Sequence, residues 1–181
     1  MIPIGYMYKG IARPPDWLGA PSVIDIYSAS ECISKNFCDY INYWKHNGFW
    51  LFNSPSVMHS LVEEHSLSLE GCTLFYYEAY DLQFIQTEKE WAEYSPINDF
   101  ETNVLSPAQP QLEGYDVSTF LCGNKPECSP LACNYLAREL PVNAHCLFAN
   151  FEEAKCAIDS GKFEHSEPGP LRILAVYSIT N

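Results

Sequence analysis

Basic side chains are scarce in this sequence. It has 10 Lys and Arg against 23 Asp and Glu, which leaves a formal net charge of −13 over 181 residues. That negative charge repels phosphate, so we expect no nucleic-acid partner and no binding to anionic membrane surfaces. The complementary partner is a basic protein or a cationic ligand.

Long apolar runs are also missing. No stretch approaches the roughly 18–20 residues that a membrane-spanning helix needs. The first nine residues lack a basic stretch followed by an apolar core, so we expect no signal peptide and a cytoplasmic location. In that reducing compartment the eight cysteines are expected to be free thiols.

Familiar catalytic motifs are absent as well. The sequence contains no Gly-x-Ser-x-Gly, no His-Glu-x-x-His and no EF-hand loop. Residues 123–126 lack both the glycine spacing and the Lys-Ser/Thr pair of a phosphate-binding loop, so we expect a turn there. We therefore expect a binding protein rather than an enzyme, with no cofactor and no metal.

What the sequence does have is the composition of a folded chain, with 47% hydrophobic and 14% aromatic residues. Strand patterns are predicted to alternate with helix patterns, which favours parallel strand pairs covered by helices. The predicted strands are 23–27, 49–52, 73–85, 115–121, 145–148 and 171–179. The predicted helices are 28–47, 55–65, 130–139 and 151–160, with further elements at a helical turn near Trp91 and a strand over 100–105.

The order of these elements indicates an internal duplication. We expect an α/β or α+β fold in which two diverged β-α-β-α-β halves pack as one compact pseudo-two-fold unit, because each half alone is a marginal core. The expected parts are an N-terminal segment (1–19), a first half (20–86), an acidic, aromatic connector (87–113) and a second half (114–181).

Sparse identities between the halves support this hypothesis. The alignment pairs Glu31-Cys32 with Glu127-Cys128, Cys38 and Tyr40 with Cys133 and Tyr135, Asn47 with Asn143, Leu51-Phe52 with Leu147-Phe148, and Tyr80 with Tyr177. On this reading the Cys and Tyr residues face a shared core, so the cysteines are structural.

Two other roles for the cysteines stay open. A zinc site could draw on Cys122, Cys128, Cys133, His145 and Cys146, but their spacing departs from the usual close pairs of ligands. Alternatively, a small thiol-dependent hydrolase or transferase could use Cys128 as the nucleophile, with His145 or His165 as the base.

The leading functional hypothesis comes from the connector. Acidic residues there are interleaved with aromatic ones, and aromatic side chains anchor interfaces while charge speeds encounter. The predicted partner-binding residues are Glu88, Glu90, Trp91, Glu93, Tyr94, Asp99 and Glu101. In size and acidity the chain is similar to bacterial immunity or inhibitor proteins, a similarity of composition that implies masking of a basic protein partner such as a toxin.

Overall fold

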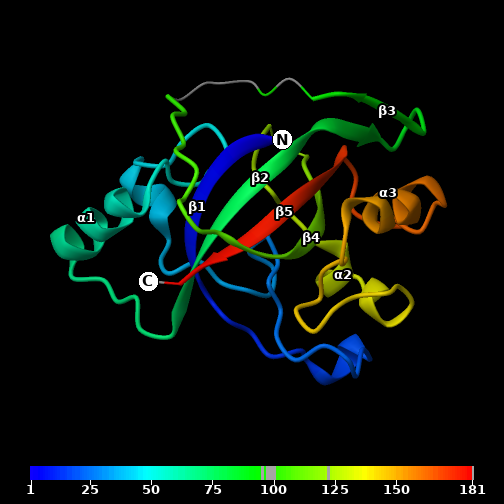
Figure 1. Cartoon of the computed structure of the whole chain (residues 1–181), viewed down its shortest axis with the longest axis horizontal. Coiled ribbons are helices and arrows are strands. Elements are labelled where there is room, and N and C mark those ends of the chain that lie inside the picture. The colour runs from blue at the N-terminus through cyan, green and yellow to red at the C-terminus, as the bar shows by residue number, and fades with distance from the viewer. Residues whose placement is uncertain (95, 97–100, 122, 181) are drawn as a thin grey trace.

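The computed structural model describes residues 1–94, 96, 101–121 and 123–180. It is a mixed α+β fold around a five-stranded antiparallel sheet with strand order β1-β2-β5-β4, and β3 pairs with β2 beyond this path (Figure 1). The elements are β1 Ile2–Gly10, η1 Asp16–Leu18, η2 Tyr40–Tyr43, α1 Pro55–His65, β2 Cys72–Ile85, β3 Glu90–Glu93, β4 Gln111–Thr119, α2 Pro130–Cys133, η3 Leu136–Arg138, α3 Phe151–Asp159 and β5 Leu171–Ile179.

The two central strands follow directly from their side chains. β5 is a nearly continuous apolar run with seven of its nine residues buried, and β2 buries the aromatic run Phe75, Tyr76 and Tyr77. Strands buried on both faces are nearly continuous apolar runs, and β2 and β5 are the two central strands of the order β1-β2-β5-β4. The strands predicted over 73–85 and 171–179 are confirmed.

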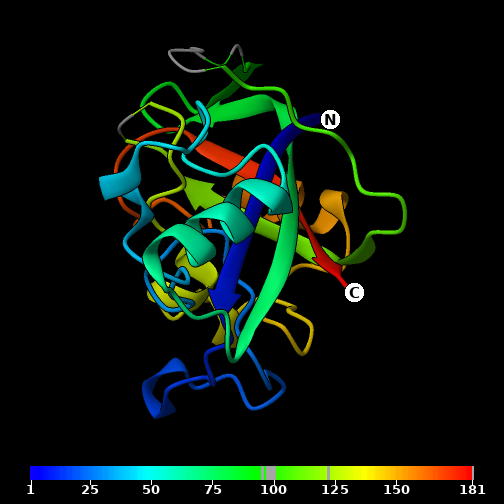
Figure 2. The ribbon, with the colours of Figure 1, turned by 90° about the vertical axis from the view of Figure 1, so that its left-hand side faces the viewer.

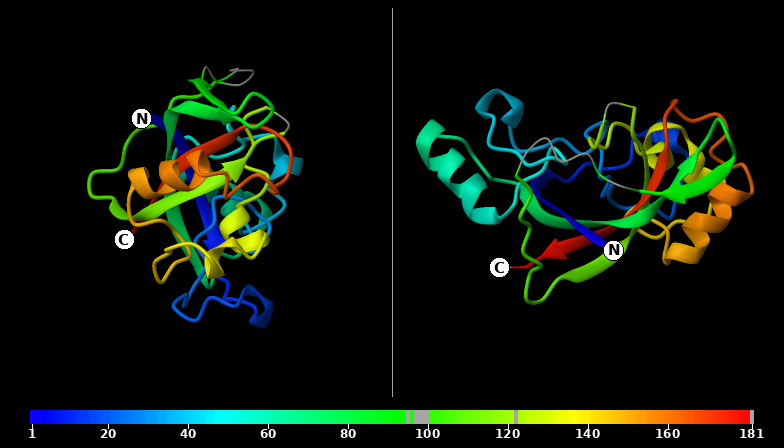
Figure 3. Two further views of the ribbon diagram at one scale, coloured as in Figure 1. Left: turned by 90° about the vertical axis from the view of Figure 1, so that its right-hand side faces the viewer. Right: turned by 90° about the horizontal axis from the view of Figure 1, so that it is seen from above.

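The helices α1 and α3 are also confirmed. Ser54 is extended and Pro55 opens α1, while the Asn150 side chain caps α3 by accepting a hydrogen bond from the Glu153 N–H at 2.9 Å. The helix α1 packs over β1 (Figure 2). Seen from above, α1 and α3 lie at opposite ends of the curved sheet (Figure 3).

The expected parallel pairing is wrong. Every ladder in the described sheet is antiparallel, because the segments 23–52 and 123–148 do not form the strands and crossover helices that parallel pairing requires. The strands predicted at 23–27, 49–52 and 145–148 are reduced to isolated bridges at Ile26, Phe52 and Phe148. Near Trp91 the predicted helical turn is instead the strand β3, and residues 101–105 of the predicted strand 100–105 are irregular.

The predicted helix over 28–47 does not form either; only a short 3-10 turn at Tyr40–Tyr43 remains. Tertiary hydrogen bonds replace the helical ones. The buried Lys9 ammonium donates to the carbonyls of Ser28, Ala29 and Ser30 at 2.9, 3.0 and 2.5 Å. The Ala29 N–H donates to Asp116 at 2.8 Å. A local amphipathic pattern cannot reveal such partners, which lie far away in the sequence.

Two clusters of apolar side chains form the core, and the N-terminal segment contributes to both. β1 packs into the first cluster, while Leu18 packs into the second, among residues of β4, α3 and β5. Beyond this segment, Ile26 packs into the second cluster as well, and the Ile24 N–H donates to the Ala144 carbonyl at 2.8 Å. Residues 1–19 are thus part of the sheet and core. Among the described residues, no helix is long and apolar enough to cross a membrane.

Two loops that precede the long helices are built alike. Asn47 donates from Nδ2 to the Ile4 carbonyl at 2.9 Å, and its Oδ1 accepts the N–H groups of Phe49 and Leu51. Asn143 donates from Nδ2 to the Glu113 carbonyl at 2.7 Å. Its Oδ1 accepts the N–H groups two and four residues further on, those of His145 and Leu147.

The strands contacted by these loops also correspond. β1 has a bulge between Pro3 and Gly5, and β4 has one between Leu112 and Gly114. Gly5 and Gly114 have φ values of +139° and +150°, and each lies against the loop of its own Asn. Each glycine therefore allows a loop to approach the strand more closely than a Cβ would permit.

Candidate functional site

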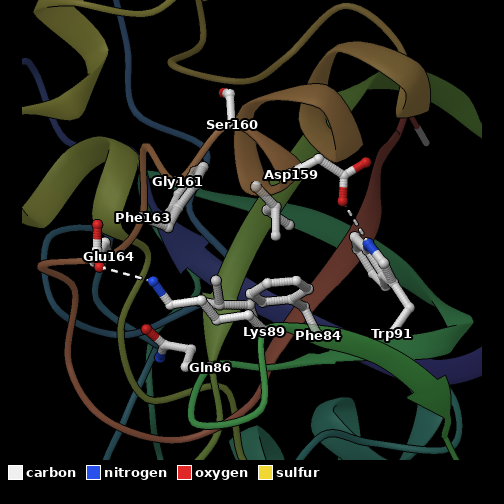
Figure 4. Close-up of a pocket in the computed structure, with 11 residues that line it drawn as sticks. Phe84, Gln86, Lys89, Trp91, Asp159, Ser160, Gly161, Phe163 and Glu164 are labelled. Atoms are coloured by element: carbon white, nitrogen blue, oxygen red, sulfur yellow. Dashed lines mark hydrogen bonds and ion pairs between the residues drawn. The ribbon is translucent and has the colours of Figure 1, made fainter.

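A cavity lies between the β2–β3 hairpin and the end of α3. It has a volume of about 380 Å³. Its apolar lining comes from Phe84, Ile158, Phe163 and Leu171, and charged groups stand at its rim. Figure 4 shows Trp91 at one side and Lys89 reaching across to Glu164. An apolar hollow with a charged rim can take a partner side chain with an apolar stem and a polar head.

The rim of this cavity is fixed by polar contacts. The Trp91 indole Nε1 donates to Asp159 Oδ1 at 2.7 Å (Figure 4). The Lys155 ammonium contacts the other Asp159 oxygen at 2.6 Å and lies 5.0 Å from the Trp91 ring centroid. Both contacts lower the pKa of Asp159, with the hydrogen bond from Lys155 contributing most. Asp159 thus remains a carboxylate near neutral pH and holds the indole in place.

The strand β3, which carries Trp91, has a ladder on one side only. It pairs with residues 82–85 of β2, and no described strand pairs with its other side. Glu88, Glu90 and Glu93 are exposed along this hairpin, and Lys89 is the basic residue among them. The hairpin therefore presents carboxylates and a partly buried indole at one sheet edge.

The remaining predicted partner-binding residues do not all join this surface. Glu101 is exposed on the segment that follows, and Asp99 lies outside the described residues. Tyr94 is only 4% exposed. Its hydroxyl donates to Asn124 at 3.0 Å, and its ring lies 3.7 Å from the Arg172 guanidinium. Tyr94 is therefore a core residue that secures the end of β3.

Three of the cysteines meet at a different place in the fold. The Sγ atoms of Cys32, Cys128 and Cys133 lie within 4.8 Å of one another. Cys32 is exposed, Cys133 is half-buried and Cys128 is buried. These residues are the one group of three or more His, Cys, Asp or Glu in the described ranges whose ligand atoms could hold a metal ion. Cys122 lies outside those ranges.

The three thiols lie close enough to shift one another's pKa. The Cys32 thiol donates to the Glu127 carbonyl at 3.2 Å, and the neighbouring Cys128 and Cys133 thiols lower its pKa. The pKa of Cys128 is raised by its hydrogen bonds with Cys133 and Cys32, by burial, and by a further hydrogen bond with Glu167. The neighbouring thiols and burial therefore oppose formation of a thiolate at Cys128.

The histidines proposed as bases have other surroundings. His145 stacks on Tyr27, with ring centroids 4.1 Å apart, and its Nε2 lies 3.7 Å from Glu113. His165 is exposed on the segment after α3. The partners that shift the pKa of Cys128 are the two other thiols and Glu167, and neither histidine is among them.

A buried network of hydrogen bonds connects the two loops that carry Cys32 and Cys128. Asp116 accepts hydrogen bonds from the Ala29 N–H at 2.8 Å and from the Ser129 hydroxyl at 2.6 Å. The Ser30 N–H in turn donates to the Ser129 hydroxyl at 3.2 Å. Because Ser30 is close to Cys32 in the sequence and Ser129 follows Cys128, this network fixes the two cysteine loops to each other.

From the sequence we expect no metal, and the thiol cluster differs from the five residues on which a zinc site could have drawn, because one of its members is remote in the chain. Cys128 and Cys133 are close in sequence to Cys122 and His145, whereas their spatial partner Cys32 comes from the first third of the chain. The alignment of Glu31-Cys32 with Glu127-Cys128 is the one sequence signal that links the two loops.

Comparison of the chain with protein-family models, with curated proteins and with solved structures finds no match. The function must therefore be argued from the chemistry of these residues.

Proposed function

We propose that this chain is a protein-binding module that docks a basic protein partner on the acidic edge formed by the β2–β3 hairpin. The observation that carries the proposal is the position of Glu88, Glu90 and Glu93 on the hairpin that ends in an edge strand. Charge of this density attracts a cationic surface and speeds its encounter with the chain.

The adjacent cavity supplies the specificity that charge alone lacks. Trp91 forms its wall, with its indole oriented by Asp159. The apolar floor can take the stem of a Lys or Arg from the partner while the cationic head reaches Asp159 or Glu164 at the rim. A basic partner with a protruding cationic side chain fits this arrangement best.

A masking or inhibitory role for this module, as in immunity proteins that cover a toxin, is the form of binding that we propose. We place it in the cytoplasm, because the described cysteines are free thiols. The thiol-enzyme alternative has less support. Cys128 is 5% exposed, and its raised pKa opposes formation of the nucleophilic thiolate.

The docking proposal is tested with a Lys- and Arg-rich peptide that carries an apolar residue on each side of its basic centre. Changing Glu88, Glu90 and Glu93 together to Lys should slow association at least about tenfold at low salt, and added salt should shrink the difference. The matched control changes Asp16, Glu63 and Glu70 to Lys. These residues are exposed and lie outside the β2–β3 hairpin.

The control separates a local site from the effect of net charge, since both variants change the charge equally. If both variants slow association by the same factor, the acidic edge is not the docking surface. A chain that binds the basic peptide no better than an acidic peptide of equal length would also sink the proposal. Circular dichroism checks that each variant is folded.

We further propose that the chain consists of two diverged copies of one unit related by a pseudo-two-fold axis between β2 and β5. Support comes from the corresponding loops of Asn47 and Asn143 and from the corresponding bulges of β1 and β4. On this proposal the copies begin with β1 and β4, at residues 2 and 111, and not at residues 20 and 114 as expected from the sequence.

The alignment of the last strands changes as well. Tyr6 and Tyr115 hold corresponding positions after the bulges, and they lie opposite Tyr76 and Ala175. Tyr76 therefore corresponds to Ala175, and the next residue, Tyr77, corresponds to Val176. The sequence alignment instead pairs Tyr80 with Tyr177.

The copies diverge most near their cysteines. Tyr40 is buried with its hydroxyl on the Trp50 carbonyl, whereas its aligned counterpart Tyr135 is 46% exposed. The expectation that both tyrosines face a shared core is therefore wrong. The difference arises because the 3-10 turn that carries Tyr40 and the short helix α2 before Tyr135 have different shapes.

A further inference from the structure

We propose that Cys32, Cys128 and Cys133 form a binding site for a zinc-class divalent cation, with the carboxylate of Glu167 as the fourth ligand. The site is separate from the acidic edge and does not depend on the proposed docking function. It would join a loop from the first part of the chain to a loop and a short helix from the second.

The distances suit a tetrahedral thiolate site. Zn–S bonds of about 2.3 Å at tetrahedral angles put sulfur atoms about 3.8 Å apart. The three Sγ atoms already lie within 4.8 Å of one another, so shifts of about an ångström or less would complete the geometry. Three converging cysteines are also a donor set that soft and borderline metals prefer over Mg²⁺ or Ca²⁺.

The backbone around the thiols is held in place before any metal binds. The Lys9 ammonium is fully buried and holds the three carbonyls of residues 28–30. Asp116 and Ser129 tie the same loop to the Cys128 segment. The Cys133 N–H donates to the Ser129 carbonyl at 3.0 Å. A preorganised ligand set loses little conformational entropy when it takes up a cation.

The local charges also favour a cation with thiolate ligands. Burial lowers the pKa of Lys9 to about 8, while the nearby Glu31, Asp116, Cys32 and Cys133 act in the opposite direction. Thiolates near Lys9 would therefore compensate its buried charge. A divalent cation would take the place of the protons of the three thiols.

Glu167 is the carboxylate that we assign as the fourth donor. It lies near the Cys128 thiol, whose pKa it raises, and its Oε2 accepts a hydrogen bond from Asn134 Nδ2 at 3.2 Å. Second-sphere bonds of this kind orient a ligating carboxylate. The Glu167 carboxylate is not among the ligand atoms that all lie within 4.8 Å of one another, so the side chain would turn toward the thiols to bind. A cation can enter from the exposed side, where a cavity of about 370 Å³ is lined by Glu31, Cys32, Lys35, Lys125, Pro126 and Glu127.

The first experiment is a titration of the reduced full-length chain with Co²⁺ and then with Zn²⁺. We expect one equivalent of Co²⁺ to produce thiolate-to-metal absorption in the near ultraviolet together with strong visible bands typical of tetrahedral cobalt, and Zn²⁺ to abolish both. Elemental analysis of the chain purified under reducing conditions should find close to one equivalent of zinc.

Variants then assign the ligands. Cys32→Ser, Cys128→Ser and Cys133→Ser should each weaken Zn²⁺ binding by more than about 100-fold, and Glu167→Gln by about 10–100-fold. Cys156→Ser is the matched control, because Cys156 is an exposed thiol on α3 outside the cluster. This control should bind as the unchanged chain does.

Two results would overturn the proposal. One is a reduced, folded chain that gives no thiolate–cobalt absorption. The other is equal Zn²⁺ affinity in the Cys32→Ser variant and the unchanged chain. Should a buried cysteine variant fail to fold, the exposed Cys32 and the titration of the unchanged chain still decide the question. A Cys32–Cys128 disulfide in the oxidised chain, combined with no metal binding in the reduced chain, likewise counts against the site.

Discussion

Asn47 and Asn143 perform the same structural task at two corresponding places in the fold. Each side chain closes a five-residue loop with its Oδ1 and ties that loop to a strand bulge with its Nδ2. Asn47 is 2% exposed, so water cannot replace the bonds that would be lost with its side chain. Only an amide of this length supplies both the acceptor and the donor.

Replacing either asparagine by alanine should therefore be costly. Asn47→Ala removes four hydrogen bonds and Asn143→Ala removes three. Both changes leave backbone groups without partners, so we expect each to lower the free energy of unfolding by about 3 kcal/mol. Urea denaturation measures this. Asn42→Ala is the control, because Asn42 is exposed and its side chain donates to the nearby Asp39 carboxylate at 3.0 Å; its effect should stay within about 0.5 kcal/mol. A large loss at one asparagine and none at the other would contradict equivalent loops.

The glycines in the two bulges should be similarly intolerant. A Cβ on Gly5 would lie 2.8 Å from the Phe52 carbonyl oxygen, and one on Gly114 would lie 2.6 Å from that of Phe148. We expect Gly5→Ala and Gly114→Ala each to cost more than about 2 kcal/mol or to prevent folding, as thermal unfolding would show.

Gly71→Ala provides the matched control for those variants. Gly71 also has a positive φ, +73°, but a Cβ added there would meet nothing within 4 Å. Its substitution should cost only the backbone strain, about 1 kcal/mol. If all three variants lose equal stability, steric approach of the loops is not what requires glycine in the bulges.

The sequence could predict those elements that depend on local signals. The apolar run of β5, the proline that opens α1 and the Asn150 cap of α3 are properties of neighbouring residues, and each lies in the predicted position. The loops of residues 12–50 and 123–148 depend on distant partners instead. Lys9 holds the carbonyls of residues 28–30, and no periodicity within those residues indicates a lysine on another strand.

The candidate sites divide in the same way. Glu88, Glu90 and Glu93 are recognisable from the sequence because charge density is a local property. In the sequence Tyr94 resembles an aromatic residue of a protein interface. Its burial depends on Arg172, which lies far away in the sequence, near the C-terminus. The cluster of Cys32, Cys128 and Cys133 depends on the tertiary fold, so only the sparse alignment of the halves indicates it.

Asp116 should make stability depend on pH with an unusual sign. Burial raises the pKa of its carboxyl from 3.8 to about 6, even though hydrogen bonds from Ser129 and Ala29 act in the opposite direction. The folded chain thus binds this proton more tightly than the unfolded chain. Its contribution to stability is fully present below about pH 4 and is lost as the pH rises through 6.

The expected loss between about pH 4 and pH 6 is about 3 kcal/mol at most from this one group. Asp116→Asn should flatten that part of the pH profile, because an amide does not titrate there. Lys9 does not obscure the test, since burial lowers its pKa to about 8 from 10.5 and its effect falls in that higher range. Denaturant unfolding at a series of pH values measures the slope. If the free energy of unfolding of Asp116→Asn falls with pH as steeply as that of the unchanged chain, other carboxylates cause the pH dependence.

Arg172 should prove irreplaceable even by lysine. Its guanidinium lies between two rings, 3.7 Å from the Tyr94 centroid and 4.1 Å from that of Phe120, and it donates to Gln83 Oε1 at 3.2 and 3.1 Å. A planar cation can stack on both faces and still donate in its own plane, whereas an ammonium cannot. We expect Arg172→Lys to lower the free energy of unfolding by about 2 kcal/mol, while Arg13→Lys at an exposed site should change it by less than about 0.5 kcal/mol. Equal stability of the two variants in urea would mean that charge alone, and not the stacked plane, secures the end of β3 to the sheet.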